Sequence, residues 1–225
     1  MKSGLARAAF ALSLLLNVSI VVVVLWMKFG GGLESVSRGR LALASERWTT
    51  QFEALPVERG DVVFLGDSIT AGGRWQELFP GLAVRNRGIP GDRVPDVAAR
   101  LSTIVAGQPS AVFLLIGTND LAYGASVDEV AAGVAGILAR FRRESRDTRL
   151  HVQSVLPRSA EHAERSVALN EAFERVAAEG EAQFVDLYGD FLDPGRNALR
   201  SDLSNDGLHL VANGYLLWRS RIEHL

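Results

Sequence analysis

From Asp61 to the end of the chain, short apolar runs alternate with glycine-containing loops and amphipathic stretches. The runs are apolar at consecutive positions, which is typical of strands that helices cover on both faces. We expect strands at Val62–Leu65, Ala83–Asn86, Ala111–Ile116, Leu150–Val155 and Gln183–Leu187, and helices at Val94–Val105, Val127–Arg143, Glu161–Glu179 and Val211–Ile222. The alternation predicts a single doubly wound, three-layer α/β/α domain around a parallel sheet.

Four polar blocks lie at the ends of these expected elements. Residues 66–70 read GDSIT after the first strand, residues 88–92 read GIPGD after the second, and residues 117–120 read GTND after the third. Residues 206–209 read DGLH just before the last helix. Because ligands bind at the carboxyl ends of the strands in open α/β sheets, we expect all four blocks on one rim of the sheet.

The blocks contain the residue types that acyl transfer needs, namely a nucleophile, a base and a group that orients the base. Ser68 is the candidate nucleophile, because a sharp strand-to-helix turn can expose its hydroxyl. His209 is the candidate base, and Asp206 can reach its far ring nitrogen if the segment bends at Gly207. The structural alternative is that Ser68 and His209 only cap helices.

In this order, the four blocks resemble those of the SGNH hydrolases, also called the GDSL esterase/lipase family. The resemblance runs from about Trp48 to the end of the chain. The chain most closely resembles the branch that includes the platelet-activating-factor acetylhydrolase subunits and bacterial acetylesterases. It implies five parallel strands in the flavodoxin-like order 2-1-3-4-5, and the catalytic triad Ser68, Asp206 and His209.

The resemblance also implies an oxyanion hole. Its donors would be the backbone N–H groups of Ser68 and Gly91 and the side-chain amide of Asn119. Gly91 is preferred because the family's oxyanion glycine directly precedes an aspartate, here Asp92, and Gly88 is a lesser candidate. Asp67 and Asp120 are interpreted as aspartates that brace their loops through backbone hydrogen bonds.

Composition argues against several other classes of function. A formal net charge of -2 provides no basic bias for nucleic acid. The absence of cysteine excludes disulfides, thiolate metal sites and a cysteine nucleophile. The four histidines lack paired ligand spacing, and the chain has no phosphate loop or dinucleotide fingerprint. We therefore expect hydrolysis without a metal or cofactor.

The N-terminal part predicts a membrane anchor. Residues 8–27 are apolar except for Ser13, Asn17 and Ser19, and as a helix they would be about 30 Å long, which is the thickness of a bilayer core. A cleaved signal peptide is the alternative, but residues 25–29 are too bulky for a cleavage site. The predicted organisation is a basic segment and signal anchor at 1–29, a linker and the start of a leading helix at 30–47, and the hydrolase domain at 48–225.

The leading helix is expected within residues 33–55, after the flexible spacer 30–32. Its candidates for packing against the domain are Leu41, Trp48, Phe52 and Leu55. Basic residues nearly balance on the two sides of the apolar segment. A short basic stretch before it is how export signals begin, so we expect the catalytic domain outside the cytoplasm, on the periplasmic or extracellular face.

The sequence thus predicts a membrane-anchored serine esterase that hydrolyses short-chain, chiefly acetyl, esters of a sugar or lipid. One alternative is an O-acyltransferase that passes the acyl group to an envelope glycan. A lysophospholipase or thioesterase uses the same chemistry on other substrates. A non-catalytic, anchored carbohydrate-binding protein is a further alternative, against which the complete set of site residues argues. The sequence does not indicate an oligomeric state.

Overall fold

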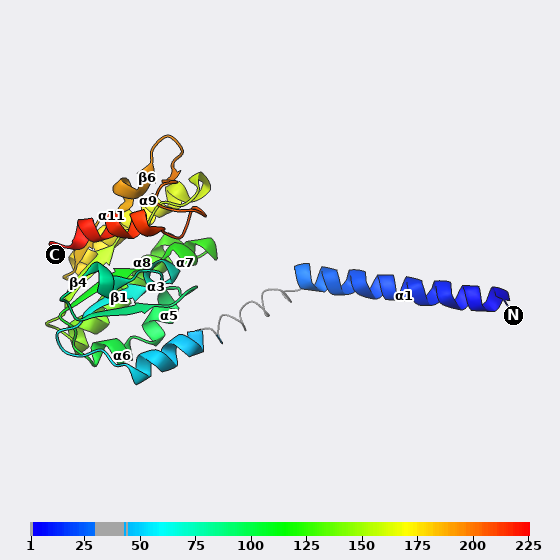
Figure 1. Cartoon of the computed structure of the whole chain (residues 1–225), viewed down its shortest axis with the longest axis horizontal. Coiled ribbons are helices and arrows are strands. Elements are labelled where there is room, and N and C mark those ends of the chain that lie inside the picture. The colour runs from blue at the N-terminus through cyan, green and yellow to red at the C-terminus, as the bar shows by residue number, and fades with distance from the viewer. Residues whose placement is uncertain (1, 30–42, 44) are drawn as a thin grey trace. The chain divides into compact units, whose positions relative to one another are not determined.

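The computed structural model describes residues 2–29, 43 and 45–225, and the side chains within 2–29 only at positions 4 and 13–26. The chain forms two compact units, Met1–Arg47 and Trp48–Leu225 (Figure 1). The expected spacer at 30–32 and residues 33–42 of the expected leading helix lie outside the described residues.

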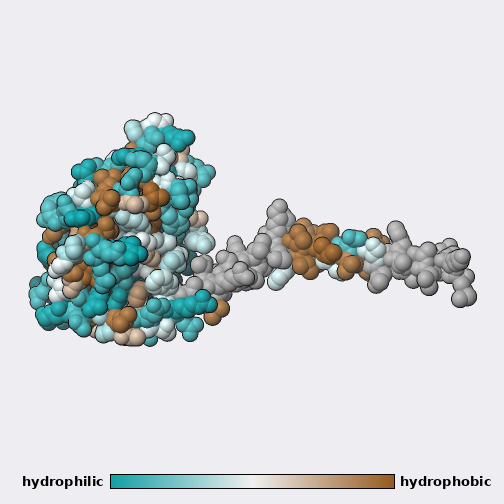
Figure 2. Space-filling view, viewed as in Figure 1, coloured by the Kyte–Doolittle hydropathy of each residue, from teal (hydrophilic) through white to brown (hydrophobic). Residues whose placement is uncertain are grey.

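The first unit contains helix α1, Lys2–Phe29. The large apolar side chains described between Leu14 and Trp26 are all exposed, and they form the hydrophobic surface of α1 in Figure 2. Among the described residues, no helix is both long enough and apolar enough to cross a membrane.

The second unit is built around a five-stranded sheet (Figure 1). Its strands are β1 (Val62–Gly66), β2 (Val84–Gly88), β3 (Ala111–Leu115), β4 (Arg149–Gln153) and β5 (Gln183–Val185). All neighbouring strands pair in parallel, in the order β2-β1-β3-β4-β5. The five expected strands and the flavodoxin-like order are therefore confirmed.

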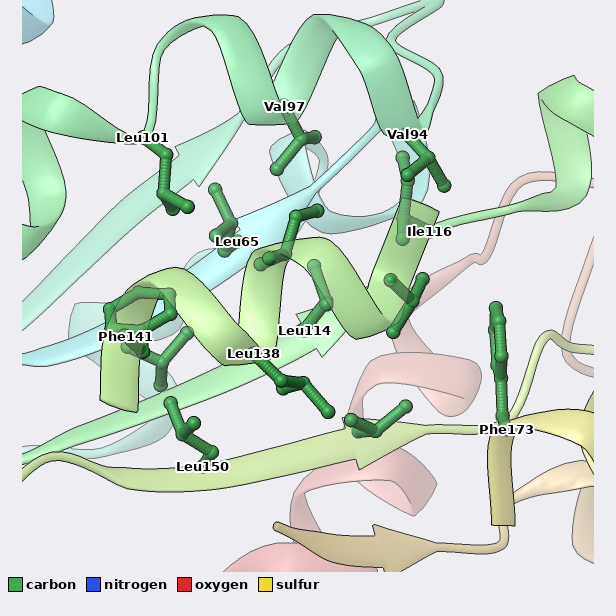
Figure 3. Close-up of a cluster of buried hydrophobic side chains, with 14 of the residues drawn as sticks. Leu65, Val94, Val97, Leu101, Leu114, Ile116, Leu138, Phe141, Leu150 and Phe173 are labelled. Atoms are coloured by element: carbon green, nitrogen blue, oxygen red, sulfur yellow. The ribbon is translucent and has the colours of Figure 1, made fainter. Parts of the chain in front are cut away.

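Successive strand residues point to opposite faces of the sheet, so the sheet has a hydrophobic core on each side. One face packs on α5 (Val94–Ala99), α6 (Ser102–Val105), α8 (Val127–Glu144) and α9 (Ala163–Glu179). The other packs on α3 (Ser68–Ala71), α4 (Trp75–Leu78), α10 (Tyr188–Phe191) and α11 (Ala212–Ile222). Figure 3 shows the first core, in which Leu65 and Leu114 of the sheet face Leu138 and Phe141 of α8. These three layers confirm the α/β/α class.

Two local predictions need correction. The helix expected at 94–105 is interrupted at Arg100, where the backbone leaves helical geometry and separates α5 from α6. Residues 45–54 are helical and Phe52 is buried, as expected, but Leu55 is 60% exposed because the helix ends there. The remaining short elements, which periodicity is too coarse to detect, are α7 (Thr118–Ala122), the 3₁₀ turn η1 (Ala160–His162) and the hairpin β6 (Leu192–Asp193) and β7 (Ala198–Leu199).

One buried side chain makes the fold sensitive to acid. His151 in β4 is buried and its ring stacks on Phe113 with centroids 4.4 Å apart. Neither ring nitrogen has a hydrogen-bond partner within the described structure. Burial, with a smaller contribution from Arg149, lowers the pKa of His151 to about 4. The unfolded chain binds this proton near pH 6.5, so the stability that the neutral ring contributes is lost as the pH falls from 6.5 toward 4.

We therefore expect His151→Phe to flatten the acid limb of the stability profile. Between pH 7 and pH 5, His151 accounts for a loss of about 2 kcal/mol in the free energy of unfolding. Urea unfolding at both pH values measures this loss, and His224→Phe, at an exposed histidine, is the matched control. Equal acid sensitivity in His151→Phe and the unsubstituted chain would show that His151 is not the responsible group.

Candidate active site

The turn after β1 exposes Ser68 at the carboxyl end of the sheet. Asp67 caps α3, because its Oδ1 accepts a hydrogen bond of 2.9 Å from the Ile69 N–H. A side chain on Gly66 would collide with the Leu115 carbonyl and the Thr70 hydroxyl, so the strand must end in glycine. Ser68 itself is only partly buried.

Asp67 is fully buried, and burial raises the pKa of its carboxyl to about 7. Its other oxygen, Oδ2, has no hydrogen-bond partner within the described structure. Asp67 braces its own turn, as expected, whereas Asp120 accepts the Val94 N–H at 3.1 Å and so connects the turn after β3 to the start of α5.

The DGLH segment brings His209 and Asp206 to Ser68. The Ser68 hydroxyl oxygen lies 3.0 Å from His209 Nε2, and His209 Nδ1 lies 2.7 Å from Asp206 Oδ2. The required bend occurs at Gly207, whose φ of 77° is in the left-handed region that favours glycine. The structure thus joins a hydroxyl, an imidazole and a carboxylate in one hydrogen-bonded chain.

The charges and hydrogen bonds of these three side chains favour proton transfer from Ser68 to His209. The hydrogen bond to His209, together with the backbone N–H groups of His209 and Leu208, holds the pKa of Asp206 well below its usual range. An ionised Asp206 accepts the Nδ1 proton, so Nε2 is left to accept the proton of the Ser68 hydroxyl. The His209 and Asp206 side chains are 46% and 49% exposed, so a substrate can reach them.

Three residues with available hydrogen-bond donors, Ser68, Gly91 and Asn119, follow the carboxyl ends of the neighbouring strands β1, β2 and β3. Gly91 follows β2 with a φ of 86°, and Asn119 follows β3. Within the part of the chain that the structure describes, the N–H groups of Ser68 and Gly91 make no hydrogen bond. Asn119 Nδ2 donates one hydrogen to the Asp92 carbonyl at 2.9 Å, so its second hydrogen is left over. All three residues are partly accessible, so their donors can serve a bound substrate.

Gly88, the lesser oxyanion candidate, is placed differently. Its N–H donates to Asn86 Oδ1 at 2.9 Å and is therefore already used. A side chain at Gly88 would collide with the backbone of Ala71. Gly88 lets β2 approach the turn that holds Ser68, and the free N–H group on this loop belongs to Gly91.

Sequence reasoning missed an ion pair beneath this site. Arg100 Nε lies 2.8 Å from Asp92 Oδ2, and both side chains are buried. Arg100 occupies a polar position in an expected amphipathic helix, where an arginine is ordinarily solvated, so the sequence carries no signal for it. Within residues 2–29, 43 and 45–225, no group of three or more metal-binding side chains is placed to hold a metal ion.

Comparison with known proteins identifies the family of the chain. A model of the GDSL-like lipase/acylhydrolase family matches residues 64–217. The chain belongs to this family. The resemblance inferred from the four blocks, that to the SGNH hydrolases, is confirmed.

Relatives of this GDSL family member include acetylhydrolases. Human platelet-activating factor acetylhydrolase IB subunit alpha1 is 30% identical over 166 residues, which cover 69% of this chain and 70% of that protein. The rat alpha2 subunit is 26% identical over 187 residues, which cover 76% of this chain and 79% of that protein.

Solved structures support the same fold. A Streptococcus pneumonia protein, reported as a candidate platelet activating factor, has a TM-score of 0.79 at 25% identity and covers 86% of this chain and 98% of that chain. A GDSL-like lipase from Bacteroides thetaiotaomicron has a TM-score of 0.65 at 24% identity, covering 80% of this chain and 95% of that one. The family and the acetylhydrolase relatives make this protein a hydrolase of ester bonds.

Proposed function

We propose that this GDSL hydrolase is a membrane-anchored serine esterase that removes short acyl groups, chiefly acetyl, from a sugar or lipid. The observation that carries the proposal is the hydrogen-bonded chain from Ser68 Oγ through His209 to Asp206, with separations of 3.0 and 2.7 Å. Nucleophile, base and orienting acid are then Ser68, His209 and Asp206.

The reaction proceeds in two halves. Ser68 Oγ attacks the ester carbonyl carbon while its proton moves to His209 Nε2. The N–H groups of Ser68 and Gly91 and the Asn119 amide stabilise the negative charge that forms on the carbonyl oxygen. The carbon–oxygen bond to the alcohol then breaks, His209 returns the proton to the departing alcohol, and an acyl-Ser68 ester remains.

In the second half, water attacks the acyl-Ser68 ester. His209 takes a proton from this water and returns it to Ser68 Oγ as the bond between the acyl carbon and Ser68 breaks. Asp206 stays ionised throughout and stabilises the imidazolium. The products are the alcohol and the carboxylic acid.

The acyl preference is supported by relatives that are named as acetylhydrolases. The test is the turnover of p-nitrophenyl acetate, butyrate, octanoate and palmitate by the full chain in detergent. We expect the highest kcat/KM on acetate. A maximum at octanoate or palmitate would overturn the short-chain proposal and favour a lysophospholipase or thioesterase.

The same assay tests the reaction class. No turnover of any ester by a folded chain would overturn the esterase proposal. Transfer of the acetyl group to an added oligosaccharide, in place of release as acetate, would show an O-acyltransferase, because an acyl-enzyme can react with either acceptor.

The membrane anchor is proposed from the apolar sequence of residues 8–27, with the boundaries 1–29, 30–47 and 48–225 and the catalytic domain outside the cytoplasm. A chain with a C-terminal tag should sediment with membranes after an alkaline carbonate wash. Added protease should remove the tag from cells or spheroplasts with an intact inner membrane. A tag in the soluble fraction would contradict the membrane anchor. A membrane-bound tag that is protected from protease would contradict the proposed orientation.

A further inference from the structure

We infer that Arg100 is a positioning residue that acts through Asp92 to hold the two oxyanion donors after β2 and β3 in place. These donors are the Gly91 N–H and the Asn119 amide. The inference rests on the proposed function, because the oxyanion hole is part of that proposal. Arg100 lies under the loop and has no direct contact with Ser68, His209 or Asp206 among the hydrogen bonds of the described residues.

The guanidinium of Arg100 lies across the carboxyl ends of β1 and β2. One terminal nitrogen donates to the Gly66 carbonyl at 3.1 Å and to the Arg87 carbonyl at 2.8 Å. Its Nε donates to Asp92 Oδ2 at 2.8 Å. One side chain therefore joins the strand that ends at the Ser68 turn, the neighbouring strand, and the loop that carries Gly91.

Asp92 connects Arg100 to both donors, the Gly91 N–H and the Asn119 amide. The Asp92 N–H and the Gly91 carbonyl belong to one peptide unit, so the Asp92 backbone fixes where Gly91 lies, and the Asp92 carbonyl accepts the Asn119 Nδ2 hydrogen at 2.9 Å. The loop is also closed by the hydrogen bond from the Asp92 N–H to the Ile89 carbonyl at 3.1 Å. A shift of the Asp92 backbone would therefore displace Gly91, together with its N–H, and weaken the hydrogen bond that holds the Asn119 amide.

A purely structural reason for this ion pair is weak. Arg100 is 8% exposed and Asp92 4% exposed, and burying two charges costs so much that an apolar pair is often as stable. An apolar pair, however, could not bind a carboxylate and two strand-end carbonyls together, as the Nε and Nη2 donors of Arg100 do. The helix is also interrupted at Arg100, between α5 and α6. The ring of Phe52 faces the Arg100 guanidinium, which lies 5.9 Å from the ring centroid.

A second ion pair on the same strands provides a matched control. Arg85 Nε in β2 lies 2.7 Å from Oδ2 of Asp61, which directly precedes β1 and is 3% exposed. This pair joins β1 and β2 near their amino ends, on the side of the sheet away from Ser68. Its loss should reduce stability without moving the oxyanion donors.

The experiment compares Arg100→Met, Arg100→Lys and Arg85→Met in the full chain. For Arg100→Met we expect kcat on p-nitrophenyl acetate to fall about 10- to 100-fold, with KM changed less than threefold, because the donors act on charge that develops only in the transition state. Hydrogen exchange of the hydrogen-bonded amides within 89–93, those of Ile89, Asp92 and Arg93, should quicken. Arg100→Lys should recover part of kcat, and Arg85→Met should lower Tm while kcat and this exchange stay unchanged.

Several outcomes would overturn the inference. The first is an unchanged kcat in folded Arg100→Met. The second is a fall in the kcat of Arg85→Met as large as that in Arg100→Met. The third is a fall in the kcat of Arg100→Met without faster hydrogen exchange of the amides within 89–93. If Arg100→Met does not fold, Arg100→Lys and Asp92→Asn provide the same two readouts. If the unsubstituted chain shows no turnover that depends on Ser68, the proposed function fails, and the exchange measurement still decides whether Arg100 holds the loop.

Discussion

Replacing Ser68 with alanine should lower kcat on p-nitrophenyl acetate by about four orders of magnitude or more. The hydroxyl is the atom proposed to form the acyl-enzyme, and its oxygen lies 3.0 Å from the base His209. Alanine leaves no oxygen at this position, while the backbone N–H that completes the oxyanion hole remains. The residual rate should therefore be that of binding and oxyanion stabilisation alone.

The control for Ser68→Ala is Ser110→Ala. The Ser110 hydroxyl donates to the Gly60 carbonyl at 2.9 Å, at the amino ends of the strands, so its loss should cost only about 1 kcal/mol of stability. Ser110→Ala should keep full kcat. Circular dichroism and Tm establish that Ser68→Ala is folded, and retained turnover in that variant would refute Ser68 as the nucleophile.

The strands β1 and β3 at the centre of the sheet could be predicted because they are buried on both faces and are apolar at consecutive positions. The edge strands β2 and β5 carry that signal less clearly, because residues 85–87 and Gln183 are polar. The regular alternation of expected strands and helices indicated these two strands. The break between α5 and α6 could not be predicted, since periodicity contains only the spacing of apolar residues and gives no sign of the buried contacts that Arg100 makes there. Two-residue strands such as β6 and β7 are likewise too short to show a period.

Some residues of the candidate site could likewise be predicted from the sequence, and others could not. Ser68, Gly91, Asn119, Asp206 and His209 lie within short motifs, where local spacing carries chemical meaning, and the structure brings Ser68, Asp206 and His209 into hydrogen-bond contact. The Arg100–Asp92 pair depends on a buried environment that forms only when β1, β2 and α5 meet. In the sequence, a buried arginine and a solvated one look alike. The residues proposed to touch the substrate are therefore easier to predict here than the residues that hold them in place.

Asp206→Asn should lower kcat by about 10³- to 10⁴-fold with little change in stability. The backbone N–H groups of Leu208 and His209 donate to Oδ1 at 2.9 and 2.7 Å, so the asparagine oxygen must occupy this position. The amide NH₂ then faces His209 Nδ1, which can only accept from it. The ring proton is forced onto Nε2, where it points at the Ser68 hydroxyl and prevents the ring from acting as a base.

The tautomer itself provides a readout that a merely structural role would not change. In Asp206→Asn, the ¹⁵N shifts of His209 should place the proton on Nε2, whereas the unsubstituted chain should carry it on Nδ1. Asp202→Asn is the matched control, because Asp202 pairs with Arg200 at 2.8 Å and is 56% exposed. It should retain kcat. A loss of less than tenfold in Asp206→Asn, with the proton still on Nδ1, would mean that Asp206 does not orient the base, and the proposed triad would reduce to Ser68 and His209.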